Sequence, residues 1–332
     1  MSTIAIDSRR SARDRILSIL RHQGALVALL LASMFGFARY AAFLTPENLL
    51  NIVRQNSMVG LVALGMTFVI LTGGIDLSVG AVLAVAGVAA VYFAQFGAFA
   101  AVIAGIGSAT LIGLINGLLI SKARIQPFIA TLAMMIAARG LALAVTHENS
   151  IPLSASGRGL EWLGRGEMGG LPVPVVVLLI AFALSWVVLH YTPFGRHVYA
   201  VGDNPDAARL LGLHVDGVLI ATYIISGAFS GLAGVMLASR LGAAQPVAGT
   251  GWELDAIAAV VVGGTVLTGG EGGVGLTIVG VLLLGVILNL LNLEGTISPW
   301  WQWVIRGAFL LAVVVVQGRM QREAARDTQA GH

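Results

Sequence analysis

The stretch TPFGRHVYAVGDNPDAARLLGLHVDG, from Thr192 to Gly217, is the longest polar interruption in the second half of a very apolar chain. It predicts one short exposed helix. Asn204 is a favourable N-cap, because its side-chain oxygen can accept a free backbone N–H. Pro205 suits the first helical position, where no N–H is needed. Gly212 can take the left-handed conformation that ends a helix.

The charges of this stretch follow the dipole of the predicted helix. Asp206 lies near its positive end and Arg209 nearer its negative end. About two turns result, and they present a small apolar face made of Ala207, Leu210 and Leu211. Such a helix can serve as a docking surface, and the alternative is an ordinary solvated loop helix.

Composition places the chain in a membrane. Of its 332 residues, 57% are hydrophobic and 11% are charged, whereas a soluble domain carries about 25% charged residues. Such a chain could not cover its surface in water, so we expect an integral membrane protein. The absence of cysteine excludes disulfides, thiolate metal sites and a cysteine nucleophile. Nothing in the charge distribution suggests nucleic-acid binding.

The apolar runs predict an all-α polytopic bundle. About 20 apolar residues cross a bilayer, and by that measure we expect about ten transmembrane helices, with glycine-rich breaks adjoining the third and eighth. The predicted spans are 24–44, 51–72, 75–95, 98–120, 127–146, 172–191, 216–239, 253–270, 274–293 and 299–317. The domain organisation that follows is a tail at 1–23, a membrane domain at 24–317 and a tail at 318–332.

The positions of the basic residues predict the topology. If the N-terminus is placed in the cytoplasm and the spans alternate, most Arg and Lys residues fall on the inner side, as the positive-inside rule requires. Both termini and the loop 192–216 are then cytoplasmic, and the longest outer loop is 147–171. An aromatic belt falls at the outer boundary, made of Trp162, Trp252, Trp300, Trp301 and Trp303.

Two glycine-rich breaks share a pattern, LTGGID at 71–76 and LTGGE at 267–271. Each ends an apolar helix and places a carboxylate just after a glycine pair. The similarity hints at an internal repeat of the kind common in transporters, although the two breaks do not occupy matching positions in a division into two five-span halves. We predict that these breaks form a gate made of Gly73, Gly74, Asp76, Ser78, Gly80, Gly269 and Gly270.

Few residues suggest chemistry. No GxxxxGK[ST] phosphate loop occurs, so the chain does not bind ATP in the usual way. No catalytic cluster and no metal-ligand spacing are found. No carboxylate falls at the middle of a predicted span, which argues against ion coupling, although backbone carbonyls can bind sodium.

The sparse polar residues within the predicted spans suit a neutral polyol, because amides and hydroxyls form hydrogen bonds without selecting for charge. For each of them an interhelical hydrogen bond is the alternative. This candidate substrate path is made of Asn56, Thr67, Asn116, Thr131, Asn289 and Asn292.

Several motifs together resemble a known family. The run GGIDLSVG at 73–80 is similar to the signature of the ribose/xylose/galactose-type permeases of ABC importers, and so is PFIATLAM at 127–134, which Arg139-Gly140 follows. The run from Thr192 to Arg209 is similar to the cytoplasmic loop of that family, and VGGT at 262–265 continues the match. The resemblance covers roughly residues 45–317.

The resemblance implies the membrane subunit of a bacterial inner-membrane importer for a monosaccharide or a related polyol. It implies a pore of two permease subunits, identical or paralogous, and a periplasmic sugar-binding protein outside. A separate ATPase would bind ATP and magnesium, so this chain would need no cofactor. That ATPase would push on the bundle through Asn204, Pro205, Asp206, Ala207, Ala208, Arg209, Leu210, Leu211 and Gly212.

Three rival functions stay open at this point. An ion-coupled secondary sugar carrier would need no ATPase, and a facilitative channel would need no energy source. A membrane-bound enzyme is disfavoured because the sequence shows no convincing catalytic cluster.

Overall fold

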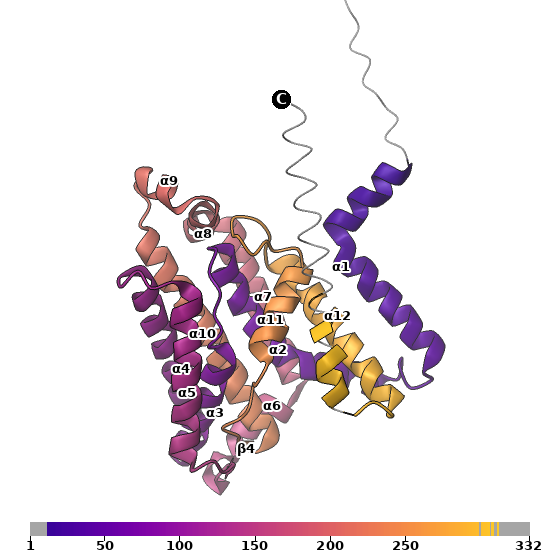
Figure 1. Cartoon of the computed structure of the whole chain (residues 1–332). Coiled ribbons are helices and arrows are strands. Elements are labelled where there is room, and N and C mark those ends of the chain that lie inside the picture. Colours follow the sequence, from indigo (N-terminus) through magenta and orange to yellow (C-terminus); the bar gives the residue numbers. More distant parts are fainter. Residues whose placement is uncertain (1–11, 299, 306, 309–310, 312–332) are drawn as a thin grey trace, which may run out of the picture.

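The computed structural model describes residues 12–298, 300–305, 307, 308 and 311 of the chain. Long helices form the body of the molecule (Figure 1), and the strands among the described residues contain two residues each. In chain order the helices are α1 Ala12–Arg39, α2 Pro46–Leu71, α3 Val79–Phe93, η1 Ala94–Phe96, α4 Ala98–Ser121, α5 Pro127–Thr146, η2 Ala155–Leu160, α6 Glu161–Arg165, α7 Val173–Tyr191, α8 Pro193–Asp203, α9 Pro205–Leu210, α10 Val215–Leu241, α11 Trp252–Val262 and α12 Val274–Glu294.

Seven of the described helices are long and apolar enough to cross a membrane, namely α2, α3 with its 3₁₀ end, α4, α5, α7, α10 and α12. They match seven of the predicted spans, with ends that differ by a few residues. The described apolar part of α1, Gly24–Arg39, is shorter. The tenth predicted span, 299–317, lies largely outside the described residues. A polytopic helical membrane protein is therefore confirmed, and the count of ten stays a prediction.

The first helix begins earlier than expected. α1 starts at Ala12, inside the stretch that the sequence assigned to the N-terminal tail. The reason is local, because no proline or glycine occurs between Ala12 and Gly24 and the stretch contains many arginines and leucines, which are good helix formers. α1 lies at one edge of the bundle and packs against α12 (Figure 1).

The third and eighth predicted spans are broken. α3 begins only at Val79, after a turn in which Gly73 has φ +76°. α11 ends at Val262, so a continuous helix over 253–270 is wrong. Residues 263–273 continue as turns, with Gly269 at φ +89° and Gly270 at φ +78°. Positive φ is open to glycine and strained for other residues. Gly73 lies in the turn that ends α2, and Gly264, Gly269 and Gly270 lie in the turns that follow α11.

The bundle is built around α2, α3 and α10, which are the most enclosed spans, whereas α4 and α5 are the least enclosed. α4 and α10 pack closely. Gly113 and Gly227 approach so nearly that a Cβ on either would collide with backbone of the other helix. Small residues thus let these two helices approach closely, as is common in membrane bundles.

The two ends of the bundle differ. α8 and α9 lie at one end, called here the α9 end, and α6 and β4 lie at the opposite end, called the α6 end (Figure 1). At the α6 end, β1 Ile151–Pro152 pairs antiparallel with β4 Ala243–Ala244. A hairpin of β2 Glu167–Met168 and β3 Leu171–Pro172 precedes α7. The predicted loop 147–171 is therefore a set of short ordered elements.

Candidate functional site

The polar stretch that begins at Thr192 forms two helices, where the sequence predicted one. α8 begins after Thr192, whose Oγ1 accepts the N–H of Gly195 at 3.2 Å. α9 begins after Asn204, whose Oδ1 accepts the N–H groups of Asp206 and Ala207 at 3.0 and 2.9 Å. Both helices follow the same rule of a side-chain cap and then a proline at the first position.

The predicted end of α9 is also found. Gly212 has φ +82°, and its N–H donates to the Arg209 carbonyl at 2.9 Å. The next N–H, of Leu213, donates to the Ala208 carbonyl at 3.0 Å. These two bonds form a Schellman cap, which satisfies carbonyls that the helix end would otherwise leave free.

The apolar face of α9 differs in part from the prediction. Leu210 and Leu211 are 90% and 80% exposed, and Ala207 is exposed as well. Ala208, however, is buried against the rest of the bundle. The free apolar surface at the α9 end is therefore the leucine pair, and Ala208 anchors the helix from below.

Ion pairs hold the base of α9. Asp216, in the first turn of α10, lies 3.0 Å from the Lys122 Nζ and 3.8 Å from the Arg124 guanidinium. The Arg209 side chain lies 3.7 Å from the same carboxylate and 3.2 Å from that of Asp206. α9 is thus connected to the turn between α4 and α5 as well as to α10.

The two glycine-rich breaks, predicted as separate features, lie against each other. The Gly270 N–H donates to the Leu71 carbonyl at 3.0 Å, and a Cβ on Gly269 would lie 2.7 Å from the Gly73 nitrogen. Gly202 of α8 joins them, since a Cβ there would overlap the Leu71 carbonyl oxygen. We call Leu71, Gly73, Gly202, Gly269 and Gly270 the glycine joint. It connects α8 to both broken crossings.

Asp76 organises the start of α3. One carboxylate oxygen accepts the N–H of Ser78 at 3.0 Å and its Oγ at 2.6 Å. The other oxygen accepts the Oγ of Ser226, on α10, at 2.8 Å. Asn116 donates to the Ser78 Oγ at 2.9 Å. Asp76 is buried, so this network fixes the broken entrance of α3 to α4 and α10.

The predicted path residues are largely occupied by internal hydrogen bonds. Thr67 contacts Thr277 at 3.0 Å, and Asn289 exchanges hydrogen bonds with Asn48 at 2.7 and 3.1 Å. Thr131 donates to the Pro127 carbonyl at 2.9 Å, and Asn56 donates to the Ile52 carbonyl at 2.7 Å. Gln302 donates to Asn292 at 3.0 Å. The alternative stated for each of them, an interhelical hydrogen bond, describes Thr67 and Asn289, whereas Asn56 bonds to a carbonyl of its own helix.

A second polar group lies where the chain re-enters the bundle. Arg139 of α5 donates through Nη1 to the carbonyls of Pro246 and Ala248, at 2.6 and 2.8 Å. Glu253, in the first turn of α11, lies close to Gly80 of α3, since a Cβ on that glycine would be 2.6 Å from its Oε2. The predicted substrate path included neither Arg139 nor Glu253.

The comparisons with known proteins agree with these motifs. Residues 48–314 match the family described as "Branched-chain amino acid transport system / permease component". The ribose import permease protein of Bacillus subtilis (strain 168) is 47% identical over 277 residues, covering 83% of this chain and 86% of that protein. The chain belongs to this permease family.

Other relatives cover somewhat more of the permease at lower identity. The ribose import permease protein of Escherichia coli (strain K12) is 40% identical over 91% of this chain and 95% of its own. The D-allose transport system permease protein of the same strain is 35% identical over 86% of this chain. No solved structure matches the permease significantly.

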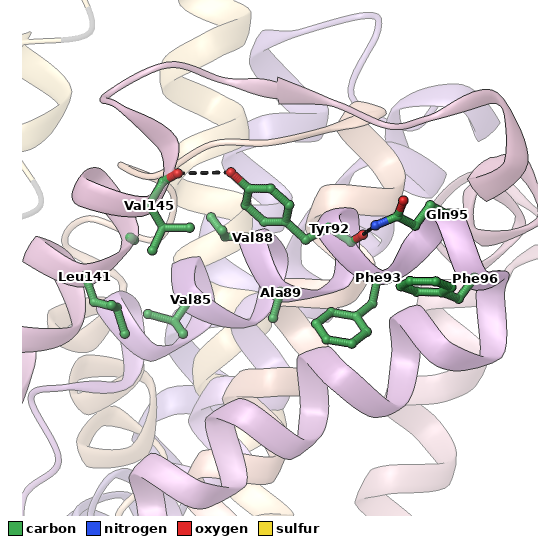
Figure 2. A pocket seen from close by; sticks show the side chains of 10 residues that line it. Val85, Val88, Ala89, Tyr92, Phe93, Gln95, Phe96, Leu141 and Val145 are labelled. Atoms are coloured by element: carbon green, nitrogen blue, oxygen red, sulfur yellow. Dashed lines mark hydrogen bonds between the residues drawn. The ribbon is translucent and has the colours of Figure 1, made fainter.

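An apolar groove also opens on the permease, between α3 and α5 (Figure 2). It holds about 440 Å³, and the Tyr92 hydroxyl closes one rim by donating to the Val145 carbonyl at 2.9 Å. Side chains such as Val85, Phe93 and Leu141 line it. Because its wall offers few polar atoms to hydroxyl groups, we do not assign it to a sugar.

The sequence contained a signal that Arg139 has a binding partner, although the prediction did not include it. An arginine inside a predicted span is costly unless it has a partner, and Arg139 lies within 127–146. The partner could not be found from the sequence, because it is the backbone of a loop more than a hundred residues away. Among the described residues, no group of three or more His, Asp and Glu could hold a metal ion.

Proposed function

We propose that the chain is the membrane subunit of an ATP-driven importer for a monosaccharide. The observation that carries this proposal is the similarity to permeases named for ribose and allose over most of both chains. The family description names branched-chain amino acids. The individual relatives bear more directly on the substrate, because their identity of 35–47% extends over most of the molecule.

The energy source would be a separate ATPase, which would bind ATP and magnesium. The chain itself has no phosphate loop in its sequence. The exposed Leu210 and Leu211 offer an apolar contact for that subunit, and the two caps of α9 make the contact rigid. A periplasmic sugar-binding protein would dock at the opposite, α6 end, and a second permease subunit would complete the pore.

The membrane orientation belongs to the same proposal. The basic residues place both termini and the α9 end in the cytoplasm, if the positive-inside rule holds for this chain. The membrane would then be the bacterial inner membrane, where the ATPase reaches α9 from the cytoplasm. The domain limits stay as predicted, with tails at 1–23 and 318–332 flanking the membrane domain.

The mechanism follows from the contacts of α8 and α9. Movement of α9 would pass to α8, because only Asn204 separates the two helices. α8 touches both broken crossings at the glycine joint, so its displacement would shift the starts and ends of α3 and α11 together. Discontinuous helices are common at the sites of transporters, in which alternating access is largely a rigid-body rocking of one part of the bundle against the other.

The proposal is tested by reconstitution. The permease is placed in proteoliposomes with the ATPase and the binding protein encoded beside its gene, and uptake of labelled ribose, allose, galactose and fructose is measured. We expect uptake of at least one sugar that requires internal ATP and persists when ion gradients are dissipated. Uptake that continues without ATP and stops with an uncoupler would instead establish an ion-coupled carrier.

A further inference from the structure

The segment between β4 and α11, residues 245–251, enters the bundle without helix or sheet. Figure 1 shows the chain climbing from β4 at the α6 end to the start of α11. The depth of this segment inside the bundle can be estimated from α5, because Arg139 lies seven residues before Thr146, the end of that helix. At 1.5 Å per residue this is roughly 10 Å along the helix axis. The carbonyls of Pro246 and Ala248 reach that depth, since Arg139 binds both.

Irregular backbone at membrane depth is tolerated only where protein buries it or water reaches it. Arg139 meets part of this need, because its guanidinium satisfies two carbonyls of the segment. The closest approach on the other side is between Gly249 and Gly80, where a Cβ on Gly80 would overlap the Gly249 carbonyl oxygen. The segment is thus held between α5 and the start of α3.

Two helix N-termini meet at this place. α3 starts at Val79 and α11 at Trp252, and Glu253 lies beside Gly80. Helix N-termini carry a partial positive charge that favours a nearby carboxylate. Arg139 adds a full positive charge and attracts Glu253 electrostatically. A carboxylate can therefore remain at this depth, where an isolated one would be very costly.

The free side of the segment carries polar side chains beside the exposed Val247. Gln245 and Thr250 are exposed, and both Arg139 and Glu253 are only partly buried. Exposed polar side chains at this depth would be unfavourable against lipid tails, so their exposure indicates water. The amides and hydroxyls that the sequence suggested for a path instead bind other side chains or backbone carbonyls inside the bundle.

We infer that Glu253, Arg139 and residues 245–250 line the outer part of the sugar passage, an inference that rests on the proposed function. The Glu253 carboxylate accepts hydrogen bonds from neighbouring hydroxyls of the passing sugar, the chemistry for which charged acceptors are strong. Arg139 is a positioning residue, which holds the segment against α5 and keeps its polar side chains turned towards the passage.

Transport per ATP tests the role of Glu253. In proteoliposomes with the partner ATPase and binding protein, we expect Glu253→Gln and Glu253→Ala to lower sugar moved per ATP hydrolysed at least tenfold. ATP hydrolysis stimulated by the binding protein should stay within twofold of the wild type, because α9 is untouched. Glu148→Gln is the matched control, since Glu148 is exposed in the loop after α5. Transport within twofold of the wild type for Glu253→Gln would overturn the assignment.

Chemical labelling tests the passage without depending on the substrate. The chain has no cysteine, so Val247→Cys introduces a single thiol on a residue that is 59% exposed. A charged, membrane-impermeant thiol reagent should label it, and Arg139→Lys should raise the labelling rate at least fivefold, because a lysine ammonium does not reproduce the planar guanidinium contact to both carbonyls. Absence of labelling would mean that lipid or packed protein covers the segment, which would refute the inference.

The two experiments separate the possible failures. If the wild type transports no sugar but Val247→Cys reacts, the proposed substrate class is wrong and the aqueous passage stands. If the wild type transports sugar and Val247→Cys does not react, the proposed function stands and the passage lies elsewhere.

Discussion

Asp76 shows how one carboxylate can fix a broken helix. Three hydrogen bonds converge on it, two from Ser78 at the start of α3 and one from Ser226 on α10. A loop at this position would otherwise leave its polar groups unpaired in an apolar bundle, which costs more than an ordinary hydrogen bond contributes. Asp76 therefore allows α3 to start inside the bundle.

Replacing Asp76 should destabilise the protein in a graded way. Asp76→Ala leaves three donors unpaired and should cost about 3 kcal/mol, whereas Asp76→Asn keeps one acceptor oxygen and should cost less. The measurement is the midpoint of thermal unfolding in detergent, followed by tryptophan fluorescence. Asp206→Asn is the control, because that carboxylate is 88% exposed. Equal midpoints for Asp76→Ala and the wild type would show that the network adds no stability.

At the scale of elements, α9 is a rigid helix with an unpartnered apolar tip. Its N-cap and its Schellman end are both complete, and its ion pairs connect it to α10 and to the turn after α4. The exposed Leu210 and Leu211 therefore belong to a helix that is held rigidly, as a contact that transmits movement requires.

Charged substitutions at this tip should separate ATP hydrolysis from uptake. Leu210→Asp and Leu211→Asp should reduce ATP-dependent uptake at least tenfold, because a carboxylate cannot enter an apolar contact without a large desolvation cost. Unfolding midpoints should not change. Leu210→Met and Leu211→Met are the controls, because each keeps an apolar side chain at the exposed tip. If uptake survives both leucine changes, α9 is not the contact for the ATPase.

The glycine joint is a second element-scale feature, because its backbones touch where no side chain fits. In Gly202→Ala the new Cβ would overlap the Leu71 carbonyl oxygen, and such overpacking typically costs about 1–3 kcal/mol. We expect a lower unfolding midpoint and reduced coupling of ATP hydrolysis to uptake. Gly107→Ala, where nothing lies within 4 Å, should be neutral or slightly stabilising. Identical behaviour of the two variants would exclude the joint as a tight contact.

At the scale of the whole molecule, the two ends of the bundle should face opposite compartments. Because the chain contains no cysteine, Leu210→Cys and Glu148→Cys each give a single site. In intact spheroplasts, an impermeant maleimide should label position 148, whereas position 210 should react only after permeabilisation. The reverse pattern would invert the proposed orientation, and labelling of both from one side would contradict the predicted topology.

Much of the fold could be predicted from single stretches of sequence. Continuous apolar runs located the seven long helices, and Asn204, Pro205 and Gly212 gave both ends of α9. α8 could have been found in the same way, because Thr192 and Pro193 repeat the cap and proline of α9. These features depend on residues within a few positions of one another, so the sequence contains their cause.

The sequence showed both glycine-rich breaks, but it did not show that they contact each other. A glycine pair after an apolar run shows that a helix can stop there. The structure confirms the stop after Leu71, whereas α11 ends at Val262, before the pair Gly269-Gly270. That Gly270 then bonds to Leu71 depends on how the helices pack. The candidate path stays a prediction for a related reason, because an asparagine in a span looks alike whether it faces a passage or another asparagine.

The sequence by itself determined that this protein is a helical membrane permease, where its helices can stop and how α9 is capped, because hydrophobic length, capping and glycine conformations are local properties. Only the tertiary structure decided that α8, α2 and the turns after α11 share one joint and that Arg139 holds a re-entering segment beside Glu253. Those contacts join residues far apart in the chain. Their partners are fixed by packing of the whole bundle rather than by neighbouring residues.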